Sequence, residues 1–481
     1  MRSHDPKPRA AETASSLGGP DPAATAPVPA VGFPGPAAAA PARPNPDRDA
    51  QPRLHTPNRQ QILSPRIIDE LLEAHHPARA VWSYVEGLDL TPLYDRIRAR
   101  GRVAGRPAID PRLLVALWLY ATLSGFTSAR ELADLCLRHD AFRWLAGGVS
   151  VNYHTLADFR TDNPAVVEQL LKQSVEVLRQ PGLIDLDRIA QDGMRVRASA
   201  GAASFHRRQT LERLREEAQA ELKARRQELA AHAAHPASTQ GVAAEDPPAG
   251  APGLSPREAT AIRHAEERVE RVEQALERMP EREAKIKPGE KKEARVSTTD
   301  PQATVMKMAD GGFRPAYNVE YGTACNGQVV VGVDVVTVGS DQGQMPPMLD
   351  QIEDRFQQRP KEVLVDGGFA NREDIETVQS GGKCKAFAPV AKPRKDTVDR
   401  HEPKATDREE VARWRKRMGT DKAKKIDTER AATAECVNAQ ARNRGLRQFM
   451  VRGLEKVKSV ATWFAIAQNM ARSFALQPRS G

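Results

Sequence analysis

The stretch 183–199, Leu-Ile-Asp-Leu-Asp-Arg-Ile-Ala-Gln-Asp-Gly-Met-Arg-Val-Arg-Ala-Ser, decides the fold of this chain. Apolar residues upstream of it follow a helical spacing, but here they alternate, with Ile189, Met194 and Val196 around Asp192. Three further runs rich in β-branched residues predict strands at 317–321, 329–336 and 363–366. Strands followed by alternating strands and helices predict a mixed α/β sheet with flanking helices.

Two aspartates of these strands are candidates for chemistry. Asp192 lies mid-strand among apolar neighbours, where a charge without a partner is costly. Asp366 ends its strand and precedes two glycines, which let backbone or substrate come close. Asp334 also lies inside an apolar strand, so a single strand aspartate is ordinary in this chain and is no site by itself.

A third carboxylate lies in a basic helical segment near the C-terminus. Glu435, Asn438 and Arg442 are spaced i, i+3 and i+7, which places a carboxylate, an amide and a guanidinium on one helix face. An acidic metal ligand beside phosphate-binding cations is chemically coherent. The expected basic stripe consists of Arg430, Arg442, Arg444, Arg447, Arg452, Lys456 and Lys458.

The region 59–180 predicts a compact helical domain after an Ala- and Pro-rich tail, 1–58, whose composition predicts disorder. Helix starts are expected at Asp110, Ser128, Thr155 and Asn163. Arginines near the helix ends could place a helix in a DNA groove, and a helical bundle with solvated arginines is an equal alternative. These arginines are Arg138, Arg143 and Arg160.

The segment 204–295 interrupts the predicted sheet and has a different character. Leucines and alanines line one charged helix, and a second apolar seam from Ile262 to Met279 keeps a 3–4 spacing behind a capping box at Ser255. An antiparallel helical hairpin is the economical interpretation, and an intermolecular coiled coil is the alternative.

Composition narrows the class of protein. Lys and Arg total 72 against 63 Asp and Glu, a formal charge of +9, which makes an anionic partner plausible. Four scattered cysteines argue against a zinc ribbon and a disulfide framework. No apolar run is long enough for a membrane helix or a signal core, so we expect a cytoplasmic protein with no membrane partner.

The chain resembles the DDE insertion-sequence transposases of bacteria over about 60–472. The stretch 183–199 is similar to the strand with the family's first aspartate, and Val365-Asp-Gly-Gly-Phe-Ala-Asn resembles its second-aspartate motif. The segment 430–445 resembles the glutamate helix, and segments at 300–318 and 341–345 also look like those of the family.

This resemblance implies an RNase H-like catalytic domain formed by 181–203 and 296–475, with a helical DNA-binding domain at 59–180. It implies Asp192, Asp366 and Glu435 as catalytic ligands of two Mg²⁺ ions, with Mn²⁺ as a substitute, because hard divalent ions take oxygen ligands and activate both oxygens of the displacement. The partners would be element ends and target DNA, in a homodimer or larger synaptic complex on the bacterial nucleoid. The expected DNA-binding residues are Arg160, Arg430, Asn438, Arg442, Arg444 and Arg447.

Two departures from the family pattern keep other functions open. Asp427 stands where a tyrosine is expected, and Arg430 lies five rather than four residues before Glu435. A catalytically impaired, transposase-derived DNA-binding protein is therefore the first alternative. A simple nuclease of the same fold is the second.

Overall fold

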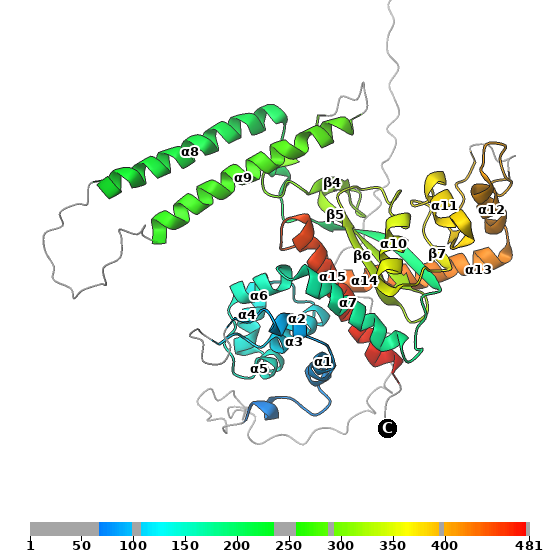
Figure 1. The fold of residues 1–481 in the computed structure, drawn as a ribbon, viewed down its shortest axis with the longest axis horizontal. Helices are drawn as coiled ribbons and strands as arrows, with labels where there is room; N and C mark the ends of the chain where they lie inside the picture. The colour runs from blue at the N-terminus through cyan, green and yellow to red at the C-terminus, as the bar shows by residue number, and fades with distance from the viewer. Residues whose placement is uncertain (1–66, 99–106, 235–255, 287–292, 394–398, 478–481) are drawn as a thin grey trace, which may run out of the picture. The chain divides into compact units, whose positions relative to one another are not determined.

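The structure, a computed structural model, describes residues 67–98, 107–234, 256–286, 293–393 and 399–477 (Figure 1). The predicted tail 1–58 lies outside these residues. Residues 66 to 481 form one compact unit.

The N-terminal part of the described chain consists of helices, and most of the helix starts that the sequence predicts are present. Asp110 caps α3 by accepting from the Arg112 amide at 2.9 Å, and Ser128 caps α4. The start expected at Thr155 is wrong, because Asn152 lies upstream and accepts from the Thr155 amide at 2.9 Å. The elements are η1 (Ile68–Leu71), α1 (Pro77–Glu86), α2 (Thr91–Tyr94), α3 (Pro111–Leu123), α4 (Ala129–Arg138), α5 (Asp140–Ala146), α6 (Tyr153–Thr161) and α7 (Pro164–Arg179).

A six-stranded mixed sheet forms the centre of the fold, as the alternating pattern predicted. The strand order is β4-β5-β1-β7-β8. β6 also pairs with β5, along 318–324, after the part of β5 that pairs with β4. β1 is antiparallel to β5 and parallel to β7, which is parallel to β8. The strands are β1 (Arg188–Arg197), β4 (Thr304–Lys307), β5 (Phe313–Ala324), β6 (Val329–Val336), β7 (Glu362–Leu364) and β8 (Lys385–Phe387).

Helices cover both faces of this sheet. On one face, α10 (Met345–Phe356) packs so closely that a Cβ on Gly322 would lie 3.0 Å from the Met348 sulfur. On the other face, the Tyr321 hydroxyl donates to the Ala461 carbonyl of α15 at 3.1 Å. The remaining elements are α11 (Arg372–Gln379), η3 (Ser380–Gly382), α12 (Glu409–Met418), α13 (Asp421–Arg430), the π-helical turn η4 (Ala431–Glu435), α14 (Cys436–Asn443) and α15 (Leu454–Leu476).

The N-terminal helices α1 to α7 are connected to the sheet through α15. α15 is buried on nearly all sides and packs against α3, α6 and α7 as well as β6 (Figure 1). Ser459 and Trp463 of α15 both donate to the Arg160 carbonyl, at 2.6 and 3.2 Å. One hydrophobic core therefore joins the N-terminal helices, α15 and the sheet.

The predicted hairpin is present as α8 (Arg208–Ala234) and α9 (Pro256–Ala284), which lie side by side within one chain (Figure 1). Ion pairs of Arg208 with Glu283 and of Arg226 with Glu266 show that the helices are antiparallel. Ser255, the expected cap, lies outside the described residues. A short ribbon, β2 (Phe205–His206) with β3 (Val296–Ser297), joins the hairpin base, whose small core is separate from the main one.

Candidate active site

Register explains why two distant aspartates are neighbours. In the parallel pair β1 and β7, Ala190 lies opposite Leu364. Asp192 lies two residues further along β1, whereas Asp366 lies two residues beyond Leu364, the last residue of β7, so the strand expected at 363–366 ends earlier than predicted. The carboxyl ends of parallel strands in an α/β sheet commonly form sites. The structure thus brings these two candidates to the same edge.

The Asp192 carboxylate is crowded and largely buried. Burial, followed by the negative charge of Asp366, raises its pKa from the ordinary 3.8 to about 6, although the Arg430 guanidinium and a hydrogen bond from Asn438 act in the opposite direction. That bond joins Asn438 Nδ2 to Asp192 Oδ2 at 2.9 Å. A carboxylate whose pKa is raised in part by a neighbouring negative charge marks a place that favours a cation.

Asp366 lies against its own backbone. The Gly368 amide donates to Asp366 Oδ1 at 2.7 Å, and a Cβ added to Gly368 would lie 2.9 Å from the same oxygen. A side chain at position 368 would therefore displace the carboxylate, which gives this glycine a physical reason.

Glu435 is linked to Asp192 only indirectly, through Arg430, and within the described residues it forms no close cluster with the two aspartates. It ends the π-helical turn η4, which packs against β1 and β5, and π-turns often mark functional sites. Its side chain is 54% exposed and pairs with Arg430 at 3.0 Å. Asn438 of the predicted helix face reaches Asp192, whereas Arg442 is exposed.

The expected DNA-contacting arginines have different surroundings. Arg442 and Arg447 are exposed, and half-buried Arg444 donates to Gln468 at 2.6 Å. Arg160 does not fit the expected role, because its guanidinium is buried, stacks over Trp118 at 4.1 Å and donates to the Thr127 carbonyl. Burial lowers the pKa of Arg160 to about 10. This arginine is a packing residue between α6 and α3.

Sequence reasoning missed two carboxylates beside the site. Glu320 of β5 is fully buried opposite Gly193, and burial together with the charge of Asp341 raises the pKa of Glu320 well above its usual range. Asp341 precedes α10 and lies in the segment 341–345, whose likeness to the family assigns it no role. The strand pattern could not identify Glu320 as a site residue, since β-strand alternation does not reveal which face of the strand meets other acids.

The residues present fit a divalent metal of the Mg²⁺ type. The donors are carboxylate oxygens, and the buried Asn438 has an Oδ1 without a hydrogen-bond partner. In the part of the chain that the structure describes, no three His, Cys, Asp or Glu side chains are gathered tightly enough to form a protein cage for a metal. Mg²⁺ commonly keeps several waters and takes one or two carboxylates plus substrate phosphates, so a cage is not required.

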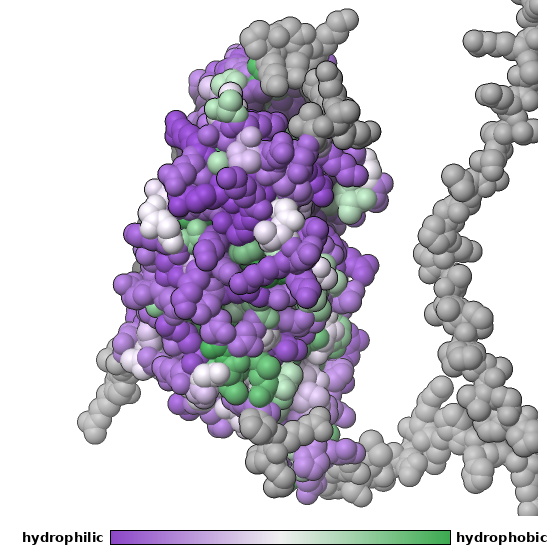
Figure 2. Space-filling model, turned by 90° about the vertical axis from the view of Figure 1, so that its right-hand side faces the viewer, coloured by the Kyte–Doolittle hydropathy of each residue, from purple (hydrophilic) through white to green (hydrophobic). Residues whose placement is uncertain are grey.

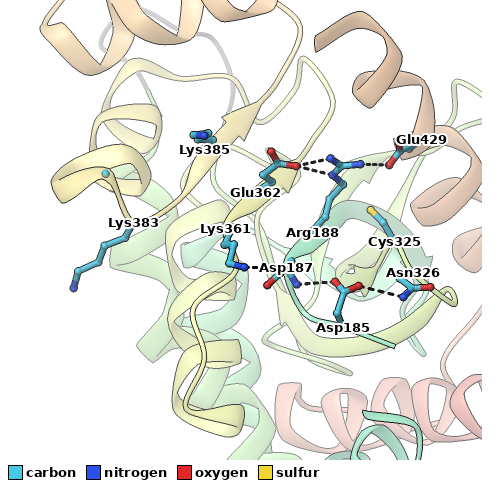
Figure 3. A pocket seen from close by; sticks show the side chains of 11 residues that line it. Asp185, Asp187, Arg188, Cys325, Asn326, Lys361, Glu362, Lys383, Lys385 and Glu429 are labelled. Atoms are coloured by element: carbon cyan, nitrogen blue, oxygen red, sulfur yellow. Dashed lines mark hydrogen bonds and ion pairs between the residues drawn. The ribbon is translucent and has the colours of Figure 1, made fainter. Parts of the chain in front are cut away.

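A cavity of about 660 Å³ lies at the opposite end of β1 and β7 (Figure 3). Several of its charges are paired, because Arg188 pairs with Glu362 and Glu429 at 2.7 and 2.6 Å, and Lys361 pairs with Asp187 at 2.7 Å. Lys383 and Lys385 also line the cavity. The aspartate pair is not among its lining residues, and we place the chemistry with the unmatched carboxylates.

The surface near α11, α12 and α13 is mostly hydrophilic, with scattered apolar patches (Figure 2). α13 exposes Lys422, Lys424 and Lys425 there. No helix within the described ranges is both long and apolar enough to cross a membrane.

Comparison with known families gives two matches on this chain. Residues 66–162 match the model Transposase domain (DUF772), and residues 382–474 match the model Transposase DDE domain. No curated protein and no solved structure matches the chain. The two family matches confirm the resemblance to DDE-type insertion-sequence transposases.

Proposed function

We propose that this chain, a DDE-type insertion-sequence transposase by its two matched domains, cleaves DNA at the ends of a mobile element and joins the freed 3′ ends to target DNA. The observation that carries the proposal is the closeness of Asp192, in the middle of β1, to Asp366, just beyond the last residue of the adjacent parallel strand β7. The alternative of a simple nuclease lacks the joining step.

The sheet supports an RNase H-like catalytic fold. Its first three long strands, β1, β5 and β6, are joined by antiparallel pairs, and β7 and β8 then extend β1 in parallel. This order puts β1 at the centre, with Asp192 of β1 beside Asp366, which follows the end of β7. Helices on both faces keep that edge rigid.

Asp192, Asp366 and Glu435 would hold the metal ions. When bound, two Mg²⁺ ions, or Mn²⁺ in their place, would stabilise the attacking and leaving oxygens of the displacement. Asn438 orients the Asp192 carboxylate through its 2.9 Å hydrogen bond. Arg430 pairs with Glu435 and offsets the charge of Asp192, so it keeps the third carboxylate close to the first.

DNA would approach the α14 side of the site. The exposed guanidiniums of Arg442 and Arg447, with Arg444 beside them, can bind phosphates on that approach. We leave Arg160 out because it is buried. The helices of 59–180 would bind element ends, and a homodimer or larger synaptic complex on the bacterial nucleoid would hold two ends.

One observation favours an impaired, transposase-derived DNA-binding protein as the second candidate. Asp427 lies beside Arg430, and its half-buried carboxylate has an Oδ1 without a hydrogen-bond partner. An acid at this place opposes a phosphate that Arg430 would otherwise attract.

Cleavage and strand transfer on paired element ends test the proposal directly. Asp192→Asn, Asp366→Asn and Glu435→Gln keep shape but remove charge, so each should bind end DNA while cleavage and joining fall by orders of magnitude. Asp334→Asn is the matched control, because Asp334 pairs with Lys458 at 3.0 Å outside the site. Cleavage without joining would identify a nuclease, and end binding without cleavage by the unaltered chain would identify the DNA-binding protein. Full activity of Asp366→Asn would refute the site.

A further inference from the structure

The loop 337–344 between β6 and α10 is tied to the sheet beside the aspartate pair. Arg195 Nη2 of β1 donates to the Gly339 carbonyl at 2.7 Å. Gln191 Nε2, also of β1, donates to the Gln344 carbonyl at 3.1 Å. Both ends of the loop are thus fixed to the strand that carries Asp192.

These ties aim Asp341 at the site. Asn318 Nδ2 donates to Asp341 Oδ1 at 2.6 Å, and a Cβ on Gly193 would lie 2.6 Å from that oxygen. A Cβ on Gly368 would lie 3.4 Å from Asp341 Oδ2 and 2.9 Å from Asp366 Oδ1. The Asp341 and Asp366 carboxylates therefore converge on one point, and glycines leave the room for both.

Two buried amides around Asp341 have unused acceptors. Asn318 is 1% exposed and Gln191 is fully buried, and both direct their nitrogens into the cluster with Glu320. Asn318 Oδ1 and Gln191 Oε1 have no hydrogen-bond partner. Buried acceptors of this kind are costly unless a donor, such as metal-bound water, joins them.

We propose that Asp341 is a fourth carboxylate of the metal site and shares a divalent cation with Asp366. This inference rests on the proposed function, since it assigns one more ligand to the same site. Neither family-like motif around Asp192 and Asp366 contains Asp341, and the position comes from the tied loop. Two carboxylates with waters suit an ion that prefers an incomplete protein shell.

Asn318 has a positioning role in this arrangement. Its Nδ2 also donates to Glu320 Oε1 at 2.7 Å, so one amide holds both acids. The Glu320 carboxyl group is fully buried behind Asp341 and supports it from within the sheet. The second carboxylate at the cation therefore has a rigid support.

Binding of Mn²⁺ to the full chain without DNA tests the proposal, measured by the loss of the free-ion paramagnetic resonance signal. Asp341→Asn should weaken Mn²⁺ binding by about tenfold or more, the scale seen when the surroundings of a metal are altered. Asp334→Asn should bind as the unaltered chain does. Circular dichroism checks folding, and Gly193→Ala, whose Cβ would displace Asp341 together with its neighbours Glu320 and Asn318, provides a second variant.

The outcomes separate this inference from the proposed function. Weaker binding in Asp366→Asn and normal binding in folded Asp341→Asn would overturn the fourth ligand alone. Normal Mn²⁺ binding in both Asp192→Asn and Asp366→Asn would overturn the proposed metal site itself. If Asp341→Asn does not fold, normal Mn²⁺ binding by Gly193→Ala overturns the inference and weakened binding supports it.

Discussion

Both ends of the neighbouring strands β1 and β7 carry acidic side chains, but the partners of these acids differ. At the amino end of β1 and β7, Asp187, Glu362 and Glu429 each accept an ion pair from Lys361 or Arg188 (Figure 3). At the carboxyl end, burial and then the charge of Asp366 raise the pKa of Asp192, and burial and then the charge of Asp341 raise the pKa of Glu320.

The difference separates charges that stabilise the fold from charges that we assign to cation binding. Matched ion pairs at the amino end need no ligand. At the carboxyl end, the ionised forms of the buried acids Asp192 and Glu320 lower the stability of the fold, and the cation that we propose there would offset this cost. The comparison yields predictions with opposite signs at the two ends.

Removing a charge at the carboxyl end should stabilise the metal-free chain. The folded-state pKa of Asp192 is raised from 3.8 to about 6, so ionisation of Asp192 lowers the free energy of unfolding. The stability of the protonated form is fully present below pH 3.8 and is lost as the pH rises through about 6. Asp192→Asn should therefore raise the free energy of unfolding at pH 8 by up to about 3 kcal/mol. Denaturant unfolding in a chelator at pH 8 and pH 3.5 measures it, and an equal gap at both pH values would contradict the repulsion.

Adding metal should reverse the penalty at this end. Mn²⁺ at a hundredfold excess over its dissociation constant should stabilise the unaltered chain by about 2.7 kcal/mol, since it binds the folded state. Thermal unfolding with and without Mn²⁺ gives the shift. Asp366→Asn should show little of it, and a full shift in that variant would move the cation away from this edge.

Removing a charge at the amino end should destabilise the fold instead. Arg188 donates to Glu362 at 2.7 Å while both side chains are largely shielded from water. Glu362→Gln should lower the free energy of unfolding by about 1 to 2 kcal/mol, because a charged hydrogen bond is lost. Denaturant unfolding at neutral pH is the measurement, and a stability gain would mean that the two ends do not differ.

Replacing the hairpin α8 and α9 by a short Gly/Ser linker should have the smallest effect on the folding of the sheet and on Mn²⁺ binding. The hairpin base has its own core, made by Leu211, Ala275, Met279 and Val296. Far-ultraviolet circular dichroism should show a folded sheet, and Mn²⁺ binding should be unchanged. Loss of the folded signal would show that the hairpin belongs to the main core.

The sequence by itself determined the local structure and the candidate acids on it. Alternation predicted the strand of Asp192 and a strand just before Asp366, although β7 already ends at Leu364. Helical spacing predicted the hairpin, and Asp110 and Ser128 marked helix starts. These features depend on residues that are neighbours in the sequence, so a short stretch of sequence is enough to predict them.

Only the tertiary structure decided which distant groups meet. The adjacent parallel pairing of β1 and β7 brings Asp192 to Asp366, and hydrogen bonds from three strand residues bring Asp341 beside them. Packing against α15 joined the N-terminal helices to the sheet, and stacking on Trp118 buried Arg160. Such contacts arise because strand order and helix docking are set by burial of whole faces, which no short stretch of sequence contains.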